Sequence, residues 1–205
     1  DRIQVYEGGI NEESQDKETG YEQVAPTVYA LVAAIDAKDS FTFQHSTNVS
    51  QYAVLLAQKL GLSRNDIQTV KVAGLLHDIG KIGIPESILK KAGKLTNEEY
   101  EIMKSHVEKS IEMIHYLPNM NYVIPAVVSH HERYDGKGYP RGIKGEEIPF
   151  LGRILAVCDS FDAMISKRAY KEPLSVEYAM GELEKNKGTQ FDPEVADAFI
   201  ELIKE

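Results

Sequence analysis

The sequence contains one cysteine, no tryptophan and no long apolar run. A single cysteine, Cys158, cannot form an internal disulfide, so we expect a reducing, cytoplasmic location. Because a bilayer span needs about 18 or more consecutive apolar residues, the sequence predicts neither a membrane-spanning helix nor a signal peptide. Positive charge is also scarce: the 205 residues carry a net charge of −9. Such a field disfavours binding to duplex nucleic acid, which requires a basic face.

Hydrophobic periodicity predicts an all-α fold for most of the chain. Residues 1–23 are polar, and we interpret them as an N-terminal tail or linker that precedes a domain over 24–205. Apolar residues in this domain recur three or four apart, as amphipathic helices require. Predicted helices cover residues 46–60, 67–79, 97–116, 125–133 and 151–166, and two more begin near Ser175 and at Pro193. Because the chain begins with Asp1, we expect it to be part of a longer protein.

Helix start signals support these boundaries. Ser63 with Asp66 and Thr96 with Glu99 have the spacing of a capping box. A loop rich in glycine and proline, over residues 134–142, separates two of the predicted helices.

The placement of histidines and aspartates is the most informative feature of the sequence. Seven of them end or interrupt apolar segments: His45, His77, Asp78, His106, His130, His131 and Asp159. A carboxylate in such a place is costly to bury unless it is paired or bound to a metal. Imidazole together with carboxylate suits Fe, Mn, Ni, Co or Zn. Since successive helix residues point about 100° apart, Asp78 can bridge two neighbouring cations.

A single buried histidine is more often a hydrogen-bonded core residue than a metal ligand. We adopt that interpretation for His115, which has no companion motif. The Gly138-Tyr139-Pro140 segment alone is likewise an ordinary turn. The combination favours a metal centre, because the other five histidines fall in motifs that one site can collect. Two divalent cations with two aspartates leave a charge of about +2, which suits an anionic phosphate.

The longer motifs resemble the HD-GYP domain, a branch of the HD phosphohydrolase superfamily. They occupy residues 77–85, 94–96, 103–106, 130–140, 153–159, 161–163 and 191–193. The resemblance covers nearly all of 24–205. It implies an all-α HD-domain helical bundle with a buried metal centre. It also implies a metal-dependent phosphodiesterase that hydrolyses cyclic di-GMP to linear pGpG and often to GMP in bacterial second-messenger signalling.

By position, the resemblance assigns seven side chains to two divalent metal ions. One ion takes His45, His77, Asp78 and Asp159, and the other takes Asp78, His106, His130 and His131. Iron or manganese is the expected metal, and nickel or cobalt would suit the same ligands. Some family members have a glutamate four residues before the first ligand histidine, which supports a third metal. Phe41 occupies that position here, so we expect two metals and leave the step from pGpG to GMP open.

The resemblance also implies how substrate is held. Asp78 and Lys81 correspond to catalytic positions, and Lys81 would help to protonate the leaving oxygen. Arg168 and Lys171 would grip phosphate. The Gly138, Tyr139 and Pro140 loop would line the substrate side, with Tyr139 near a guanine.

Other interpretations stay open from the sequence. The domain can be a non-catalytic cyclic-dinucleotide-binding or partner-docking module, although degenerate relatives usually lose ligands. It can also hydrolyse another nucleotide, and cyclic di-GMP is not separated from cyclic GMP-AMP. The oligomeric state is open, and a homodimer is one permitted state. Residues 1–6 resemble the last strand of a GGDEF domain, which implies a diguanylate-cyclase-like domain upstream.

Overall fold

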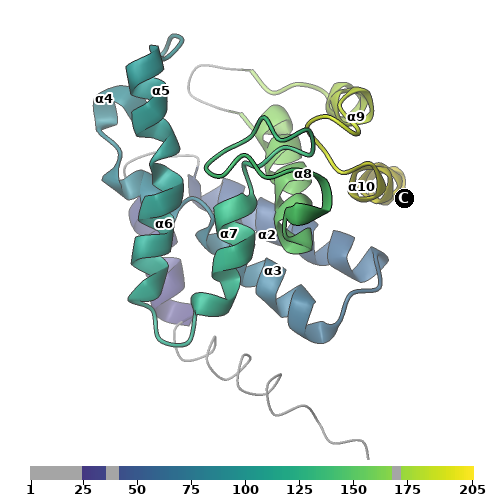
Figure 1. Cartoon of the computed structure of the whole chain (residues 1–205), viewed down its shortest axis with the longest axis horizontal. Coiled ribbons are helices and arrows are strands. Elements are labelled where there is room, and N and C mark those ends of the chain that lie inside the picture. The colour runs from purple at the N-terminus through teal and green to yellow at the C-terminus, as the bar shows by residue number, and fades with distance from the viewer. Residues whose placement is uncertain (1–24, 36–41, 168–171) are drawn as a thin grey trace, which may run out of the picture.

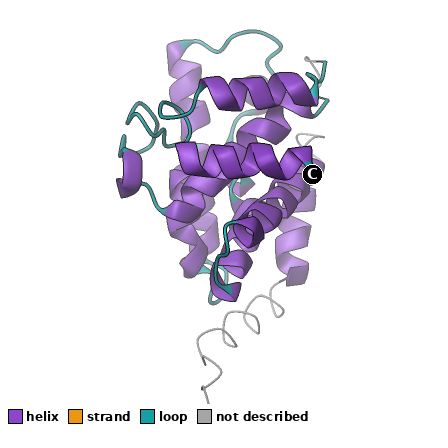
Figure 2. Ribbon diagram, turned by 90° about the vertical axis from the view of Figure 1, so that its right-hand side faces the viewer, coloured by secondary structure: helices purple, strands orange, loops and turns teal. Residues whose placement is uncertain are grey.

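The structure is a computed structural model that describes residues 25–35, 42–167 and 172–205. In these ranges the chain consists of helices, short 3₁₀ turns and loops, with no strand (Figure 2). Lys187 and Phe191 form an isolated β-bridge. The predicted all-α fold is therefore confirmed. None of the helices in the described ranges has the length and apolar character that crossing a membrane requires.

Residues 25–35 are helical. The α-helices that follow are α2 (Thr42–Lys59), α3 (Arg64–Leu76), α4 (Glu86–Leu89), α5 (Asn97–Lys104), α6 (His106–His115), α7 (Ile124–Ser129), α8 (Phe150–Ile165), α9 (Val176–Lys185) and α10 (Pro193–Lys204) (Figure 1). The 3₁₀ helices are η1 (Ile79–Gly83), η2 (Asn121–Val123) and η3 (Gly145–Glu147).

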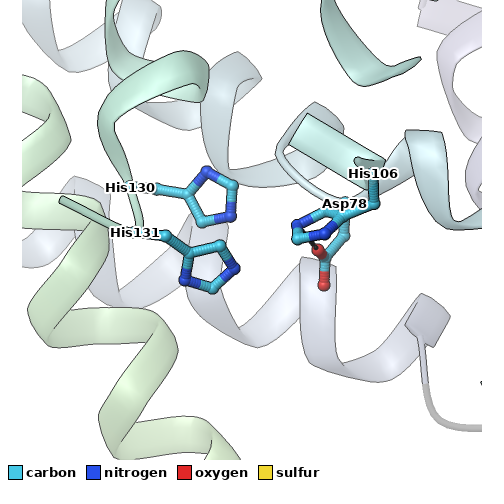
Figure 3. Close-up of side chains that lie close together, drawn as sticks. All are labelled: Asp78, His106, His130 and His131. Carbon is cyan, nitrogen blue, oxygen red and sulfur yellow. Dashed lines mark ion pairs between the residues drawn. The ribbon is translucent and has the colours of Figure 1, made fainter. Parts of the chain in front are cut away.

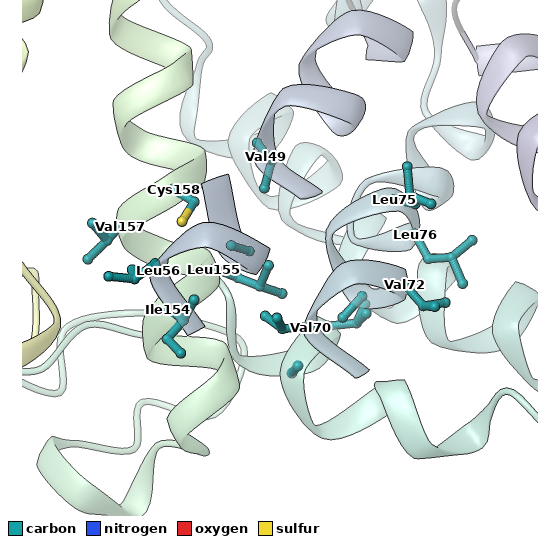
Figure 4. Packing of buried hydrophobic residues seen from close by; sticks show 14 of the residues in the cluster. Val49, Leu56, Val70, Val72, Leu75, Leu76, Ile154, Leu155, Val157 and Cys158 are labelled. Atoms are coloured by element: carbon teal, nitrogen blue, oxygen red, sulfur yellow. The ribbon is translucent and has the colours of Figure 1, made fainter. Parts of the chain in front are cut away.

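The core forms where α2 packs against α3 and α8. Apolar side chains from all three helices interlock there, including Leu56, Leu76 and Leu155 (Figure 4). Gly74 allows the close approach of α3 to α2, because a Cβ atom at this position would lie 2.7 Å from the Cα of Ser50. This tight crossing brings the C-terminal end of α3 to the centre of the molecule.

The predicted helix caps are confirmed, although α3 begins at Arg64 rather than at the predicted residue 67. The Thr96 hydroxyl and the Glu99 carboxylate form a full capping box at α5. The Ser63 hydroxyl accepts from the backbone N–H of Asp66 at α3. At α10 the carboxylate of Asp192 accepts from two backbone N–H groups of the first turn.

Two predicted helices end earlier than expected and a third contains a break, and each of these errors lies beside a predicted metal ligand. The predicted helix 97–116 is two helices that meet at Ser105. There the His106 ring donates to the carbonyl of Met103, and the Ser105 hydroxyl donates to that of Ile102. Likewise, α3 ends at Leu76 and α7 at Ser129, so the motifs that follow them lie in turns. Polar side chains that compete for backbone carbonyls end these helices early.

Candidate metal centre

The turn after α3 carries His77 and Asp78 into the interior, where both are buried. Gly80 follows at the start of η1 and packs tightly against α6. A Cβ atom at Gly80 would lie 2.0 Å from the carbonyl oxygen of His106. The hydroxyl of Ser110 accepts from the Gly80 N–H at 2.8 Å and donates to the His77 carbonyl at 3.0 Å. The turn is thus locked against the helix that supplies the next histidine.

The turn after α7 supplies two adjacent histidines, His130 and His131. Their rings face His106 and Asp78 across one space (Figure 3). The centroid of the His130 ring lies 3.9 Å from that of His131 and 5.1 Å from that of His77. Three segments far apart in sequence therefore meet at one point.

Helices α2 and α8 add a third side to this space. The Nε2 atom of His45, on α2, lies 3.1 Å from Oδ1 of Asp159, on α8. The His45 ring centroid is 5.5 Å from that of His77. The structure thus brings together all seven residues singled out in the sequence.

The ligand atoms of these residues fall into two groups, each with all its atoms within 4.8 Å of one another. One group is Asp78, His106, His130 and His131, and the other is His45, His77 and Asp159. The carboxylate of Asp78 faces both groups. Its Oδ1 lies 3.3 Å from Nε2 of His106, and its Oδ2 lies 3.3 Å from Nε2 of His77. A bridging ligand requires this placement, although Asp78 lies beyond the end of its helix rather than on it.

Three buried imidazoles are oriented by the carbonyl three residues earlier, to which Nδ1 donates. The pairs are His77 with Gly74 at 2.8 Å, His106 with Met103 at 2.7 Å, and His130 with Val127 at 2.5 Å. Metal-binding histidines are usually held in this way, because the bond fixes the tautomer and leaves Nε2 to bind the ion.

The Nε2 atoms of His77, His106 and His130, together with Oδ1 of Asp78, are buried and have no hydrogen-bond partner within the protein. Buried polar atoms are nearly always partnered, so the convergence of these acceptors fits a site for a metal ion. The mixture of imidazole nitrogen and carboxylate oxygen fits a divalent transition metal.

Charge states agree with this fit. Burial lowers the pKa of His131 to about 4 and that of His130 well below its ordinary value. Both rings are therefore neutral, which is the form that binds metal. Burial alone would favour the neutral acid at Asp78, but the Lys81 ammonium and His77 hold its pKa well below the usual range. His130 and His131 thus present neutral rings beside the ionised carboxylate of Asp78.

Comparison with protein-family models matches residues 30–195 to the HD domain. The chain belongs to the HD-domain family. This membership accounts for the helical bundle and for the His/Asp clusters at its centre.

Individual relatives support the narrower resemblance to the HD-GYP branch. A "Cyclic di-GMP phosphodiesterase" of Thermotoga maritima is 44% identical over 82% of this chain and 46% of its own length. A "3'3'-cGAMP-specific phosphodiesterase 2" of Vibrio cholerae is 39% identical over 85% of this chain and 34% of its own length. The chain therefore spans less than half of these relatives. A solved structure described as an HDG"Y"P protein from Bdellovibrio bacteriovorus shares the fold at 19% identity, with a TM-score of 0.67, covering 95% of this chain and 66% of that one.

Lys81 of the HD domain stands at the edge of the metal centre. It lies in η1, and its ammonium is 2.6 Å from Oδ2 of Asp78. The Lys81 side chain is 20% exposed, whereas that of Asp78 is buried. Lys81 therefore has a charged end at the site and access to whatever enters it.

The Gly138, Tyr139 and Pro140 loop covers His131. The Tyr139 N–H donates to the His131 carbonyl at 3.2 Å, and the two rings lie 4.8 Å apart at an angle of 32°. Gly138 leaves no room for a side chain, because its Cβ would lie 2.4 Å from the backbone nitrogen of Arg133. The loop is therefore more than an ordinary turn: it is fitted closely to the residues next to the metal centre.

Three residues to which the family resemblance gave significance lie outside the described residues: Phe41, Arg168 and Lys171. Their expected roles stay predictions.

Asp162 was not predicted as a site residue, but it supports one. Its fully buried carboxylate accepts from Nδ1 of His45 at 2.6 Å. Burial alone would lower the pKa of His45, but hydrogen bonds with Asp159 and Asp162 raise it to about 9. A cation at this position must therefore displace a proton. The spacing of Asp159 and Asp162 on one helix face was the sequence signal for this residue.

Proposed function

We propose that this HD domain is a metal-dependent phosphodiesterase that hydrolyses cyclic di-GMP to linear pGpG. The main support is the carboxylate of Asp78, which faces two clusters of ligand atoms at once. The Thermotoga maritima relative, named as a cyclic di-GMP phosphodiesterase, supports the choice of substrate. The single buried thiol of Cys158 is compatible with a reducing, cytoplasmic setting.

His45, His77, Asp78 and Asp159 would hold one divalent ion, and Asp78, His106, His130 and His131 the other. Bound divalent ions supply Lewis-acid stabilisation of charge on the phosphate and activation of the attacking water. Iron or manganese, and also nickel or cobalt, suit these ligands. With Phe41 at the position of the additional family glutamate, we propose two ions rather than three.

The residues of the chain then have separate tasks. The ammonium of Lys81, held 2.6 Å from Asp78, carries the proton for the departing 3′-oxygen. The buried carbonyls behind the histidines keep their rings oriented, so that no reorganisation is needed on binding. Tyr139 and its loop exclude water on one side of His131. Arg168 and Lys171 are proposed to hold phosphate oxygens.

Product analysis tests this proposal. Protein loaded anaerobically with iron or manganese is incubated with cyclic di-GMP, and the nucleotides are separated by chromatography. We expect pGpG from the wild type and none from Asp78→Ala. Equal rates from both proteins would refute the site assignment, and a wild type that binds no metal would favour a non-catalytic reader.

A second candidate substrate is cyclic GMP-AMP, favoured by the 39% identical Vibrio cholerae relative that is named for it. The same assay run on both nucleotides separates the two candidates by their kcat/KM.

A further inference from the structure

Helix α5 lies at the edge of the bundle and contributes no buried residue to the core (Figure 1). Its Tyr100 is nevertheless a large aromatic side chain that is 47% exposed. Substitutions in such a helix leave the packing of the domain intact, so its side chains can be tested for function separately from stability.

Tyr100 belongs to a row of rings that begins at the metal centre. Its ring contacts that of Tyr139 edge to face, with centroids 6.3 Å apart and an angle of 80°. The Tyr139 ring in turn lies 4.8 Å from that of His131. Aromatic surface therefore runs without a break from a predicted metal ligand to the outside of the domain.

Lys104 places a positive charge against this row. Its ammonium lies 5.3 Å from the centroid of Tyr100 and 5.8 Å from that of Tyr139. It also contacts Oε1 of Glu101 at 2.6 Å, in an ion pair whose glutamate is 69% exposed. An exposed pair of this kind contributes little, and an ammonium has three N–H donors, so Lys104 can donate to a ligand as well.

We propose that Tyr100, Tyr139 and Lys104 bind one nucleobase of the substrate, and that Lys104 makes this site prefer guanine to adenine. The inference rests on the proposed function, since the phosphodiester must lie at the metal centre for a base to reach the rings. Bases of every kind stack on exposed aromatic rings. A lysine donates to O6 and N7 of guanine, whereas adenine presents an amino donor at position 6.

The stacking part is tested with Tyr100→Ala. We expect KM for cyclic di-GMP to rise by about 5- to 150-fold, with kcat within about twofold, because this is the usual contribution of base stacking on one aromatic ring. The Kd for a non-hydrolysable phosphorothioate analogue, measured by calorimetry, should increase in parallel. The matched control is Tyr178→Ala on α9, a tyrosine that is 54% exposed and should leave both constants unchanged.

The base preference is tested with Lys104→Met, which keeps the aliphatic stem and removes the charge. We expect the ratio of kcat/KM for cyclic di-GMP over cyclic di-AMP to fall by about tenfold, through loss on the guanine substrate alone. The control is Lys185→Met, whose side chain is 73% exposed on α9. Equal losses on both substrates, or none, would overturn the preference.

The outcomes also separate this inference from the proposed function. A wild type that hydrolyses cyclic di-GMP while Tyr100→Ala behaves identically refutes only the base site. A wild type that binds the phosphorothioate through Tyr100 without hydrolysing cyclic di-GMP refutes only the phosphodiesterase. Absence of binding to any cyclic dinucleotide refutes both.

Discussion

At the scale of single residues, Asp162 shows how a ligand depends on the group behind it. Its carboxylate accepts from His45 at 2.6 Å, from the side-chain amide of Asn48 at 2.8 Å and from the hydroxyl of Ser166 at 3.0 Å. These three bonds fix the orientation of the Asp162 carboxylate. It therefore holds the His45 ring with Nε2 towards Asp159.

Asp162→Asn should weaken metal binding by about 10- to 100-fold, because the orientation and basicity of His45 depend on the carboxylate. Metal titration with a competing chelator measures the change. Asp197→Asn, at an exposed aspartate on α10, is the control and should bind metal as the wild type does. Unchanged affinity in Asp162→Asn would mean that His45 is not a ligand or is positioned otherwise.

Lys81→Met should lower kcat for cyclic di-GMP by about 10²- to 10⁴-fold, the usual worth of a general acid, without loss of bound metal. The loss should be much smaller with bis(p-nitrophenyl) phosphate, whose leaving group departs without a proton. Steady-state rates on the two substrates are compared, with Lys185→Met as the control. A uniform loss on both would assign Lys81 to phosphate binding rather than to proton donation.

At the scale of elements, Gly80 and Gly93 form a matched pair of test positions, because Gly80 is closely packed and Gly93 is not. Gly80→Ala places a methyl group 2.0 Å from a backbone carbonyl of α6, so η1 must move. We expect a loss of about 1–3 kcal/mol in the free energy of unfolding, together with weaker metal binding. Gly93→Ala meets nothing within 4 Å and should change neither. Urea unfolding and metal titration of both variants provide the measurement.

The loop that carries Tyr139 begins with an ion pair, in which Nη2 of Arg133 lies 2.8 Å from Oδ2 of Asp135. The hydrogen bond from Arg133 lowers the pKa of Asp135 from 3.8 to about 2. Because the folded-state pKa is depressed, the stabilisation is present above pH 3.8 and disappears as the pH falls through about 2. Thermal melts of wild type and Asp135→Asn should therefore differ by a constant amount above pH 5 and converge at lower pH. A difference independent of pH would exclude this pair as its source.

His45 and His106 were assigned through the family resemblance, whereas the convergence of His77 and Asp78 with His130 and His131 was predictable from sequence, because each pair lies in a contiguous motif. The ends of α3 and α7 could not be predicted, because the apolar periodicity of each helix continues into residues whose side chains hydrogen-bond to backbone carbonyls. The ring contact between Tyr100 and Tyr139 could not be predicted from sequence either. It joins residues 39 positions apart through tertiary packing, and no sequence motif contains both of them.

At the scale of the whole molecule, the two ligand clusters draw side chains from five segments of the bundle that lie far apart in the sequence. Ligand atoms come from α2, from the turns after α3 and α7, from the start of α6, and from α8. Convergent buried acceptors without partners oppose folding, since each has lost its water. An ion that binds them in the native state alone removes that cost.

Chelation should therefore lower the unfolding temperature of the whole domain in one cooperative step. Saturation at 100 times Kd adds about 2.7 kcal/mol to the free energy of unfolding, and two ions add more. Melts with and without manganese measure the increment, and Asp78→Ala should show almost none because it removes the carboxylate that faces both clusters. Asp197→Asn should keep the full increment. If metal stabilised Asp78→Ala as much as the wild type, the ions would bind elsewhere, and the convergence of these side chains would need another cause.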